Sequence, residues 1–187
     1  DVVSGSDSVE VTCCMELTPV LGSEPQALQL QGVDLLLQSI AIDHKALNPS
    51  DYSLTAEGLV IHQPPQVPFQ LTTMCRIDPQ ANTSLEGLYA SGGMLTTQCE
   101  AEGFRRITYH PDRPDVLSRF TVRIEADRDR YPVLLSNGNA LSAGPLAGDP
   151  TRHEVTWQDP SLKPSYLFAL VAGDLHEVRD RFVTLSG

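Results

Sequence analysis

The sequence has no apolar run long enough to span a bilayer, since the short run Leu35–Leu37 ends at Gln38. Its opening segment, Asp1–Asp7, is neither basic nor apolar enough to be predicted as a signal peptide. There is no Cys-x-x-Cys pair, which excludes the usual zinc-ribbon arrangement, and four cysteines in 187 residues are too few for a disulfide scaffold. These absences predict a cytoplasmic protein with reduced thiols.

Basic side chains are scarce in the first half of the chain. Residues 1–98 hold 11 acidic and 2 basic residues, whereas residues 99–187 hold 13 acidic and 11 basic ones. An acidic surface repels phosphate and anionic lipid, so neither nucleic acid nor membrane is an expected partner. The hydrophobic content of 41% is ordinary for a globular protein with a proper core. We expect residues 1–187 to form a single domain.

Helical periodicity is also scarce, and strand patterns dominate. Apolar and polar residues alternate in three segments, which predicts half-buried strands at Val9–Leu17, Phe69–Ile77 and Phe120–Ala126. Between Val33 and Ile42 the apolar phase slips near Gln38, which predicts a bulge or bend. Tyr166–Val171 is apolar at every position, which predicts a central strand covered on both sides. Asp112–Phe120 could hold one short helical turn.

Turn-forming pairs such as Glu57-Gly58, Asp78-Pro79 and Asn137-Gly138 recur along the chain. A turn about every ten residues is typical of β-sandwiches and barrels. The sequence therefore predicts an all-β fold with little helix, built from mainly antiparallel strands in two packed sheets.

One polar motif stands out, Thr97-Gln98-Cys99-Glu100-Ala101-Glu102-Gly103. In an extended segment Gln98, Glu100 and Glu102 share a face, and one amide with two carboxylates offers acceptors for an ammonium group. Two other interpretations stay open: the solvated face of an edge strand, and a hydrolase that uses Glu100 and Glu102 as a carboxylate pair. Cys99 points to the opposite face in this pattern, which favours a structural role.

The same motif resembles the segment that the bacterial aminopeptidase N family, a group of zinc metallopeptidases, places beside the substrate's free amino terminus. The resemblance covers most of the chain. Its six segments are Asn82–Tyr89, Thr97–Arg105, Arg113–Phe120, Leu134–Asn139, Trp157–Pro160 and Lys163–Asp174. Each match is modest alone, and all six in this order make the resemblance strong.

The resemblance implies an amino-terminal β-sandwich or saddle domain that packs on a thermolysin-like catalytic domain. It implies that Gln98 and Glu100 accept hydrogen bonds from the ammonium group of a peptide substrate. Glu102 is expected to pair with Arg105 or Arg106 instead. Tyr166–Val171 is the candidate strand bordering the face that the catalytic domain covers.

The family's zinc motif, His-Glu-x-x-His, does not occur here. His153-Glu154 and His176-Glu177 are not followed by a second histidine at the required position. We therefore expect no catalytic residue and no metal ligand in this chain, and zinc bound only in a catalytic domain that follows residue 187. The chain alone should be inactive. The alternative is a free-standing β-sandwich module that binds peptides or another protein.

Overall fold

The computed structural model describes residues 8–20 and 24–185, so the segment Asp1–Asp7, not predicted to be a signal peptide, lies outside the described residues. Strands dominate the described chain, with two 3-10 helices of three residues each. The elements are β1 (Val9–Leu17), β2 (Leu28–Gln31), β3 (Leu36–Ile42), β4 (Lys45–Ala46), β5 (Tyr52–Leu54), β6 (Gly58–Ile61), β7 (Phe69–Ile77), β8 (Gly87–Ser91), β9 (Met94–Gln98), η1 (Phe104–Arg106), β10 (Leu117–Asp127), β11 (Val133–Ser136), β12 (Asn139–Leu146), β13 (Asp149–Pro164), η2 (Ser165–Leu167) and β14 (Leu170–Gly173).

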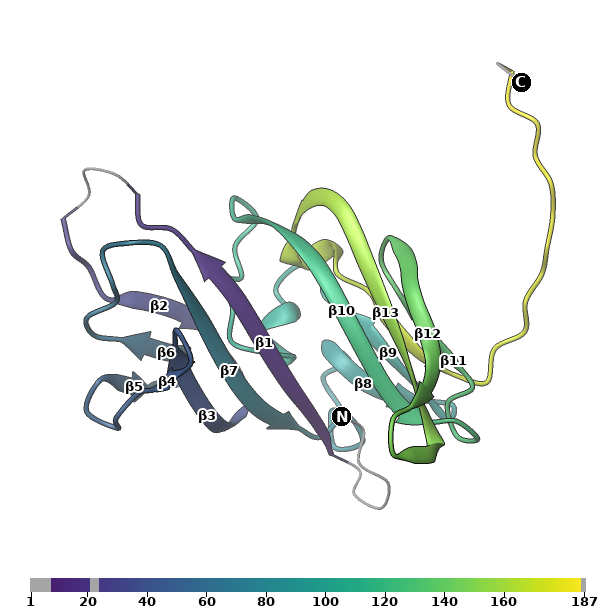
Figure 1. The fold of residues 1–187 in the computed structure, drawn as a ribbon, viewed down its shortest axis with the longest axis horizontal. Coiled ribbons are helices and arrows are strands. Elements are labelled where there is room, and N and C mark those ends of the chain that lie inside the picture. The colour runs from purple at the N-terminus through teal and green to yellow at the C-terminus, as the bar shows by residue number, and fades with distance from the viewer. Residues whose placement is uncertain (1–7, 21–23, 186–187) are drawn as a thin grey trace.

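These strands form four antiparallel sheets (Figure 1). The β7 sheet has the order β1-β7-β3-β4, and the β6 sheet has the order β2-β6-β5. The β13 sheet has the order β10-β13-β12, and the β9 sheet has the order β11-β14-β9-β8. The all-β class and the antiparallel pairing are confirmed. The sequence predicted two sheets and the structure has four, because alternation marks strands without showing where one sheet ends and the next begins.

Two hydrophobic cores lie side by side. The β7 and β6 sheets enclose one core, which includes the fully buried Leu59 and Leu71. The β9 and β13 sheets enclose the other, which includes Leu134 and Ala126. Val11 packs against both cores, so the two halves of the fold share apolar contacts.

The alternating segments fold as predicted. In β7 every odd residue from Phe69 to Ile77 is buried, because one face of the strand covers the core. In β1 and in the predicted part of β10, Phe120–Ala126, the apolar residues are likewise buried or half-buried, whereas Leu117 at the start of β10 is 53% exposed. The predicted bulge is present, since the register of β3 on β7 shifts between Leu37 and Ser39.

Two predicted local elements are wrong. Tyr166–Val171 is not one strand: its first residues belong to η2, and β14 starts only at Leu170. Phe168 between them turns into the core, while Leu167 stays 51% exposed. The helical turn predicted within Asp112–Phe120 is absent from this described segment, where a hydrogen-bonded turn, Val116 N to Arg113 O at 3.1 Å, leads into β10.

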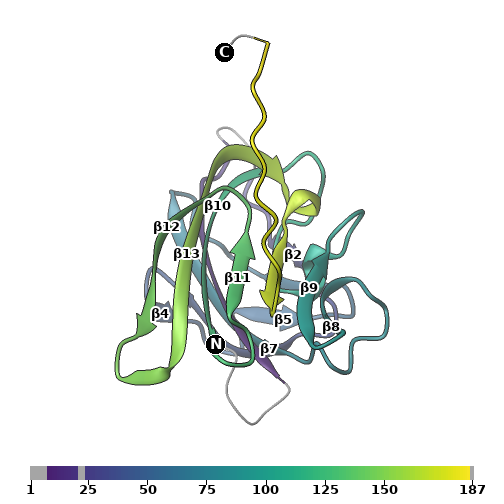
Figure 2. The same ribbon diagram turned by 90° about the vertical axis from the view of Figure 1, so that its right-hand side faces the viewer.

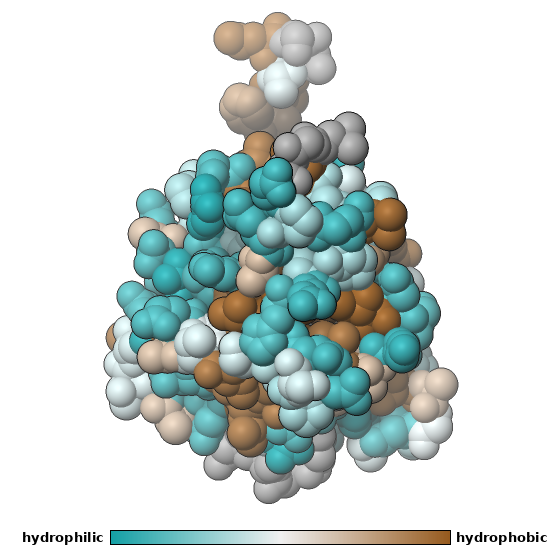
Figure 3. Space-filling view, turned by 90° about the vertical axis from the view of Figure 1, so that its left-hand side faces the viewer, coloured by the Kyte–Doolittle hydropathy of each residue, from teal (hydrophilic) through white to brown (hydrophobic). Residues whose placement is uncertain are grey.

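The surface at the end of the molecule formed by β2, β5 and β6 is largely hydrophilic, with separate apolar patches between polar side chains (Figure 3). Within residues 8–20 and 24–185, no helix is long and apolar enough to cross a membrane.

Candidate functional site

The predicted anchor residues lie at the end of β9, an inner strand of the β9 sheet (Figure 2). Residues opposite each other in an antiparallel pair point to the same side of the sheet. Leu95 and its partner Ala172 are buried and therefore face the core. Thr96 pairs with Val171 and faces outward, and Gln98, two residues further along β9, faces outward too.

Strand β9 ends at Gln98, and the chain turns at once. Glu100, Ala101 and Glu102 lie in an exposed turn that Gly103 N closes by donating to Cys99 O at 2.9 Å. The prediction that Glu100 and Glu102 continue the strand's alternation is therefore wrong, because a glycine-closed turn replaces the extended backbone. The Glu100–Ala101 peptide bond within it is cis.

Gln98 and Glu100 are nevertheless held together. The Gln98 side-chain Nε2 donates to the backbone oxygen of Glu100 at 3.1 Å. This bond uses the donor end of the amide and leaves its oxygen available as an acceptor. The Glu100 carboxylate is exposed and makes no hydrogen bond or ion pair with any residue that the structure describes. The two residues predicted from the motif thus offer an amide oxygen and a carboxylate at the end of β9.

Glu102 is engaged elsewhere, as predicted. Its carboxylate lies 3.1 Å from Arg105 Nη1, although the Glu102 side chain remains 67% exposed. The Glu102 carboxylate therefore has a partner within the chain, unlike that of Glu100 among the described residues.

A buried network behind the turn was missed by the sequence analysis. Arg105 donates to Asp112 Oδ2 through its backbone N at 3.1 Å and its Nε at 2.9 Å, and its Nη2 donates to Asp112 O at 3.0 Å. Asp112 also accepts a hydrogen bond from Ser165 Oγ, and its backbone N donates to Gln31 Oε1 at 2.9 Å. Ser165 is 53 positions from Asp112, so no local pattern could have predicted the contact.

Cys99 lies between the two anchor residues and is only 3% exposed. Burial raises the pKa of its thiol to about 12, and the neighbouring Asp112 carboxylate adds to the shift. A thiol held in its neutral form is a poor nucleophile. The structural role predicted for Cys99 agrees with this environment.

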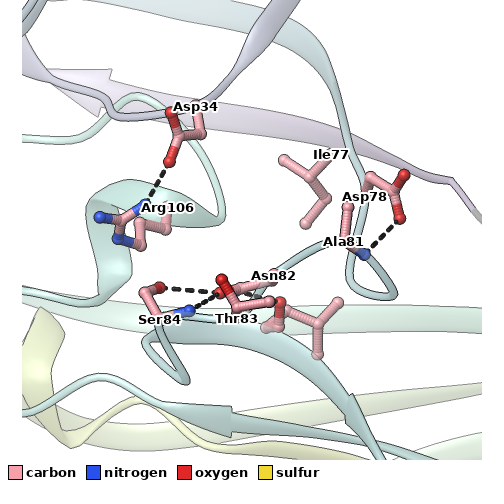
Figure 4. Close-up of a pocket in the computed structure, with 9 residues that line it drawn as sticks. Asp34, Ile77, Asp78, Ala81, Asn82, Thr83, Ser84 and Arg106 are labelled. Atoms are coloured by element: carbon pink, nitrogen blue, oxygen red, sulfur yellow. Dashed lines mark hydrogen bonds and ion pairs between the residues drawn. The ribbon is translucent and has the colours of Figure 1, made fainter.

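A cavity of about 340 Å³ lies on the other side of η1, between the end of β7 and the loop before β8 (Figure 4). Arg106 faces it and binds Asp34 and Glu86. Asp78 caps the backbone N–H groups of Gln80 and Ala81 at 3.0 Å each. These charged groups are already paired within the chain, so the cavity offers less to a ligand than the open acceptors at Gln98 and Glu100.

Within residues 8–20 and 24–185, no three His, Cys, Asp or Glu side chains come together in a group that could hold a metal ion. The described residues therefore do not fit a zinc site, and no metal-dependent step is assigned to them.

Solved structures that match this fold include two peptidases. Aminopeptidase A of Legionella pneumophila, in complex with aspartic acid, matches with a TM-score of 0.83 and 39% identity over 89% of this chain and 20% of its own. An M1 zinc metallopeptidase of Deinococcus radiodurans bound to a Tyr-Ser-Ala substrate matches with a TM-score of 0.72 and 15% identity, over 89% of this chain and 38% of its own, which shows the shared fold alone. The chain thus has the all-β fold found in part of these two proteins.

The family model for the peptidase M1 N-terminal domain matches residues 2–167, and the chain belongs to this family. Aminopeptidase N of Caulobacter vibrioides is 56% identical over 166 residues, which are 89% of this chain and 19% of the relative. Aminopeptidase N of Escherichia coli is 53% identical over 167 residues, 89% of this chain and 18% of the relative. The chain therefore spans about a fifth of the length of these curated relatives.

Proposed function

We propose that this chain is the amino-terminal domain of a zinc-dependent aminopeptidase that removes residues one at a time from the amino terminus of peptides. In this proposal Gln98 and Glu100 bind the free α-ammonium group of the substrate. The observation that carries it is that Gln98 and Glu100 are linked by the bond from Gln98 Nε2 to the backbone O of Glu100 at 3.1 Å. Together they offer an amide oxygen and a carboxylate that has no partner among the described residues.

The chemistry of an ammonium group explains the choice of residues. It has three donors and no acceptor, so Gln98 Oε1 and the Glu100 carboxylate can satisfy two donors. Charge-assisted hydrogen bonds of this kind are stronger than neutral ones. Fixing the amino terminus also fixes the register of the peptide, which presents the first peptide bond to the catalytic centre. The role proposed for the two residues is therefore binding and orientation.

The catalytic domain is the proposed partner of the outer face of the β9 sheet. Leu135 on this face is 39% exposed, and its sheet neighbour Val171 points the same way. Residues 174–185 leave the sheet without forming a helix or strand, and they carry four exposed apolar side chains, Val178, Phe182, Val183 and Leu185 (Figure 1). Exposed apolar groups on the β9 sheet and in the segment that follows it support contact with another part of the enzyme. Phe168 is excluded from this face because it is buried in the domain's own core.

Zinc, in this proposal, is bound by the catalytic domain and supplies the activated water that attacks the peptide bond. We also propose a cytoplasmic location, which is supported by the four free cysteines. A free-standing peptide-binding module remains the alternative, and the same exposed acceptors would serve it.

The test is steady-state kinetics on an enzyme that contains this chain and its catalytic domain, with the variants Glu100→Gln and Gln98→Ala. Removing the carboxylate charge should cost roughly 2–5 kcal/mol of transition-state binding, about thirty-fold or more in kcat/KM. Gln98→Ala deletes a neutral acceptor and should cost only ~1 kcal/mol.

Glu16→Gln is the matched control, because it removes the same charge from an exposed position on β1. It should leave kcat/KM unchanged. Inhibitors that bind the zinc without presenting an amine should bind all variants equally. If Glu100→Gln stays within about two-fold of the wild type, the anchor assignment is wrong.

A further inference from the structure

Gln98 and Glu100 are linked by the bond from Gln98 Nε2 to Glu100 O at 3.1 Å, and each has a further support of its own. Gln98 is the last residue of β9, and the preceding Thr97 accepts a hydrogen bond at Oγ1 from Leu170 N at 2.8 Å. Gln98 itself pairs with Gly87 of β8, and the bond to Thr97 ties this end of β9 to β14. Glu100 lies beyond the last strand residue, in an exposed turn, so no strand partner fixes it.

The turn that carries Glu100 is anchored from its far end by Arg105. One edge of the Arg105 guanidinium holds Glu102 of the turn at 3.1 Å. The other edge holds the carboxylate of Asp112, whose side chain is 2% exposed. A planar guanidinium can bind groups on two edges at once in a fixed geometry, which a lysine ammonium cannot do.

Asp112 in turn is fixed by the rest of the fold. Ser165 Oγ in η2 binds one carboxylate oxygen, and the Asp112 backbone N binds Gln31 Oε1 of β2 at 2.9 Å. A buried carboxylate is stable only when donors satisfy it, so each of these partners constrains its position. Hydrogen bonds and ion pairs thus connect the core to Asp112, Asp112 to Arg105, and Arg105 to the turn.

We propose that Arg105 and Asp112 are positioning residues for substrate-amine binding, acting on Glu100 through the turn more than on Gln98, whose backbone is fixed by pairing with β8. This inference rests on the proposed function of Gln98 and Glu100. A misplacement of about 1 Å in an orienting group can cost on the order of a hundred-fold in rate. The contacts of Arg105 with Glu102 and Asp112 therefore determine how well the Glu100 carboxylate is placed to bind the ammonium group.

The experiment uses the enzyme that contains this chain and its catalytic domain. It compares kcat/KM for an aminoacyl nitroanilide with inhibition by an amino-acid hydroxamate and by the same hydroxamate without its amino group. The ratio of the two inhibition constants measures amine selectivity, which does not change when a variant merely lowers the amount of folded enzyme. Thermal melting verifies that each variant is folded.

Arg105→Lys keeps the positive charge, but a lysine cannot bind Glu102 and Asp112 at the same time in the geometry of a guanidinium group. It should lower kcat/KM and amine selectivity by roughly ten-fold or more, while the amine-free inhibitor binds as it does to the wild type. Arg106→Lys is the matched control, since Arg106 is the next residue of η1, is similarly buried and also binds two carboxylates, but faces the cavity of Figure 4. The control should change neither quantity.

Double variants separate positioning from general damage. In a Glu100→Gln background the Arg105→Lys effect should largely disappear, whereas in a Gln98→Ala background it should persist in full. Equal effects in both backgrounds would overturn the proposal. If Arg105→Lys does not fold, Glu102→Gln replaces it, because this exposed change removes only the turn's link to Arg105.

Glu102→Gln should reduce amine selectivity by about two- to five-fold, the range of an exposed ion pair, and unchanged selectivity would overturn the inference. The two proposals fail in different ways. If Glu100→Gln itself leaves amine selectivity unchanged, the proposed function is wrong. If Glu100→Gln lowers it but Arg105→Lys, or Glu102→Gln in its place, does not, only the positioning inference is wrong.

Discussion

Gly103 lies so close to the backbone of Gln98 that a β-carbon on it would be 2.3 Å from the Gln98 carbonyl oxygen. The φ angle of Gly103 is −80°, so its backbone suits any residue, and the requirement for glycine is purely steric. The same β-carbon would be 2.9 Å from the backbone N of Gly87 in β8. The turn that carries Glu100 therefore packs so closely against β8 and β9 that no side chain fits at Gly103.

Gly103→Ala should destabilise the domain by about 1–3 kcal/mol, because the added methyl group meets backbone atoms that cannot move without breaking β9. Gly144→Ala is the control, since nothing lies within 4 Å of its β-carbon position. That control should stay within about 0.5 kcal/mol of the wild type. Urea unfolding of both variants measures the difference. Equal stabilities for the two variants would show that the turn has more room than the structure indicates.

Alternation predicted β1, β7 and β10 because each strand has one face against a core and one against solvent. The strand predicted at Tyr166–Val171 was wrong, because this apolar segment is not a regular strand. Leu167 is exposed in η2 while Phe168 packs edge-on against Phe104, with ring centroids 5.0 Å apart. A run of apolar letters cannot distinguish a covered strand from a turn with one inward and one outward side chain.

The candidate site, like the strands, could be predicted from the sequence only in part. Gln98 and Glu100 could be identified from the motif, since an amide and a carboxylate two residues apart are visible in the sequence. The support behind them could not, because Asp112 meets Gln31 across 81 positions and Ser165 across 53. Such contacts depend on which sheets pack together, and no periodicity records that arrangement.

The 187-residue chain alone should fold into an all-β domain and hydrolyse no aminoacyl nitroanilide, with or without added zinc. The physical reason is that the described residues bring no set of metal ligands together. Far-ultraviolet circular dichroism and a nitroanilide assay are sufficient measurements. Zinc-dependent turnover that co-purifies with the chain and resists inhibitors of host aminopeptidases would contradict this prediction.

Thiol alkylation of the folded chain at pH 8 should modify Cys14 and spare the other three cysteines. Cys14 is exposed, whereas burial raises the pKa of Cys13 to about 12, of Cys75 to about 11 and of Cys99 to about 12. Only the thiolate reacts, so both burial and a raised pKa protect a thiol.

Intact mass after iodoacetamide treatment should therefore show one adduct, and the variant Cys14→Ser should show none. In urea all four thiols should react. Rapid modification of Cys99 in the folded chain would contradict the packing of the segment between Gln98 and Glu100.

His110 should make the domain less stable in mild acid. Its side chain is buried beside Phe104 and Phe120, with ring centroids 5.0 and 6.2 Å away, and its Nδ1 has no hydrogen-bond partner among the described residues. Burial lowers the pKa of His110 below its usual value of 6.5, although the nearby Asp112 opposes the shift. Below pH 6.5 the unfolded chain therefore binds more protons than the folded chain, and folding stability falls as the pH falls.

The variant His110→Phe tests this directly, because phenylalanine can extend the aromatic cluster and does not titrate. For the wild type, the free energy of unfolding should decrease between pH 6.5 and 5 with a slope of at most about 1.4 kcal/mol per pH unit from this residue. The His110→Phe curve should be flatter by that amount over the same range, while His62→Phe, which replaces an exposed histidine, should follow the wild type. Urea unfolding at several pH values gives both slopes. Parallel curves for the wild type and His110→Phe would mean that His110 is not held neutral in the core, and that the acid sensitivity has another origin.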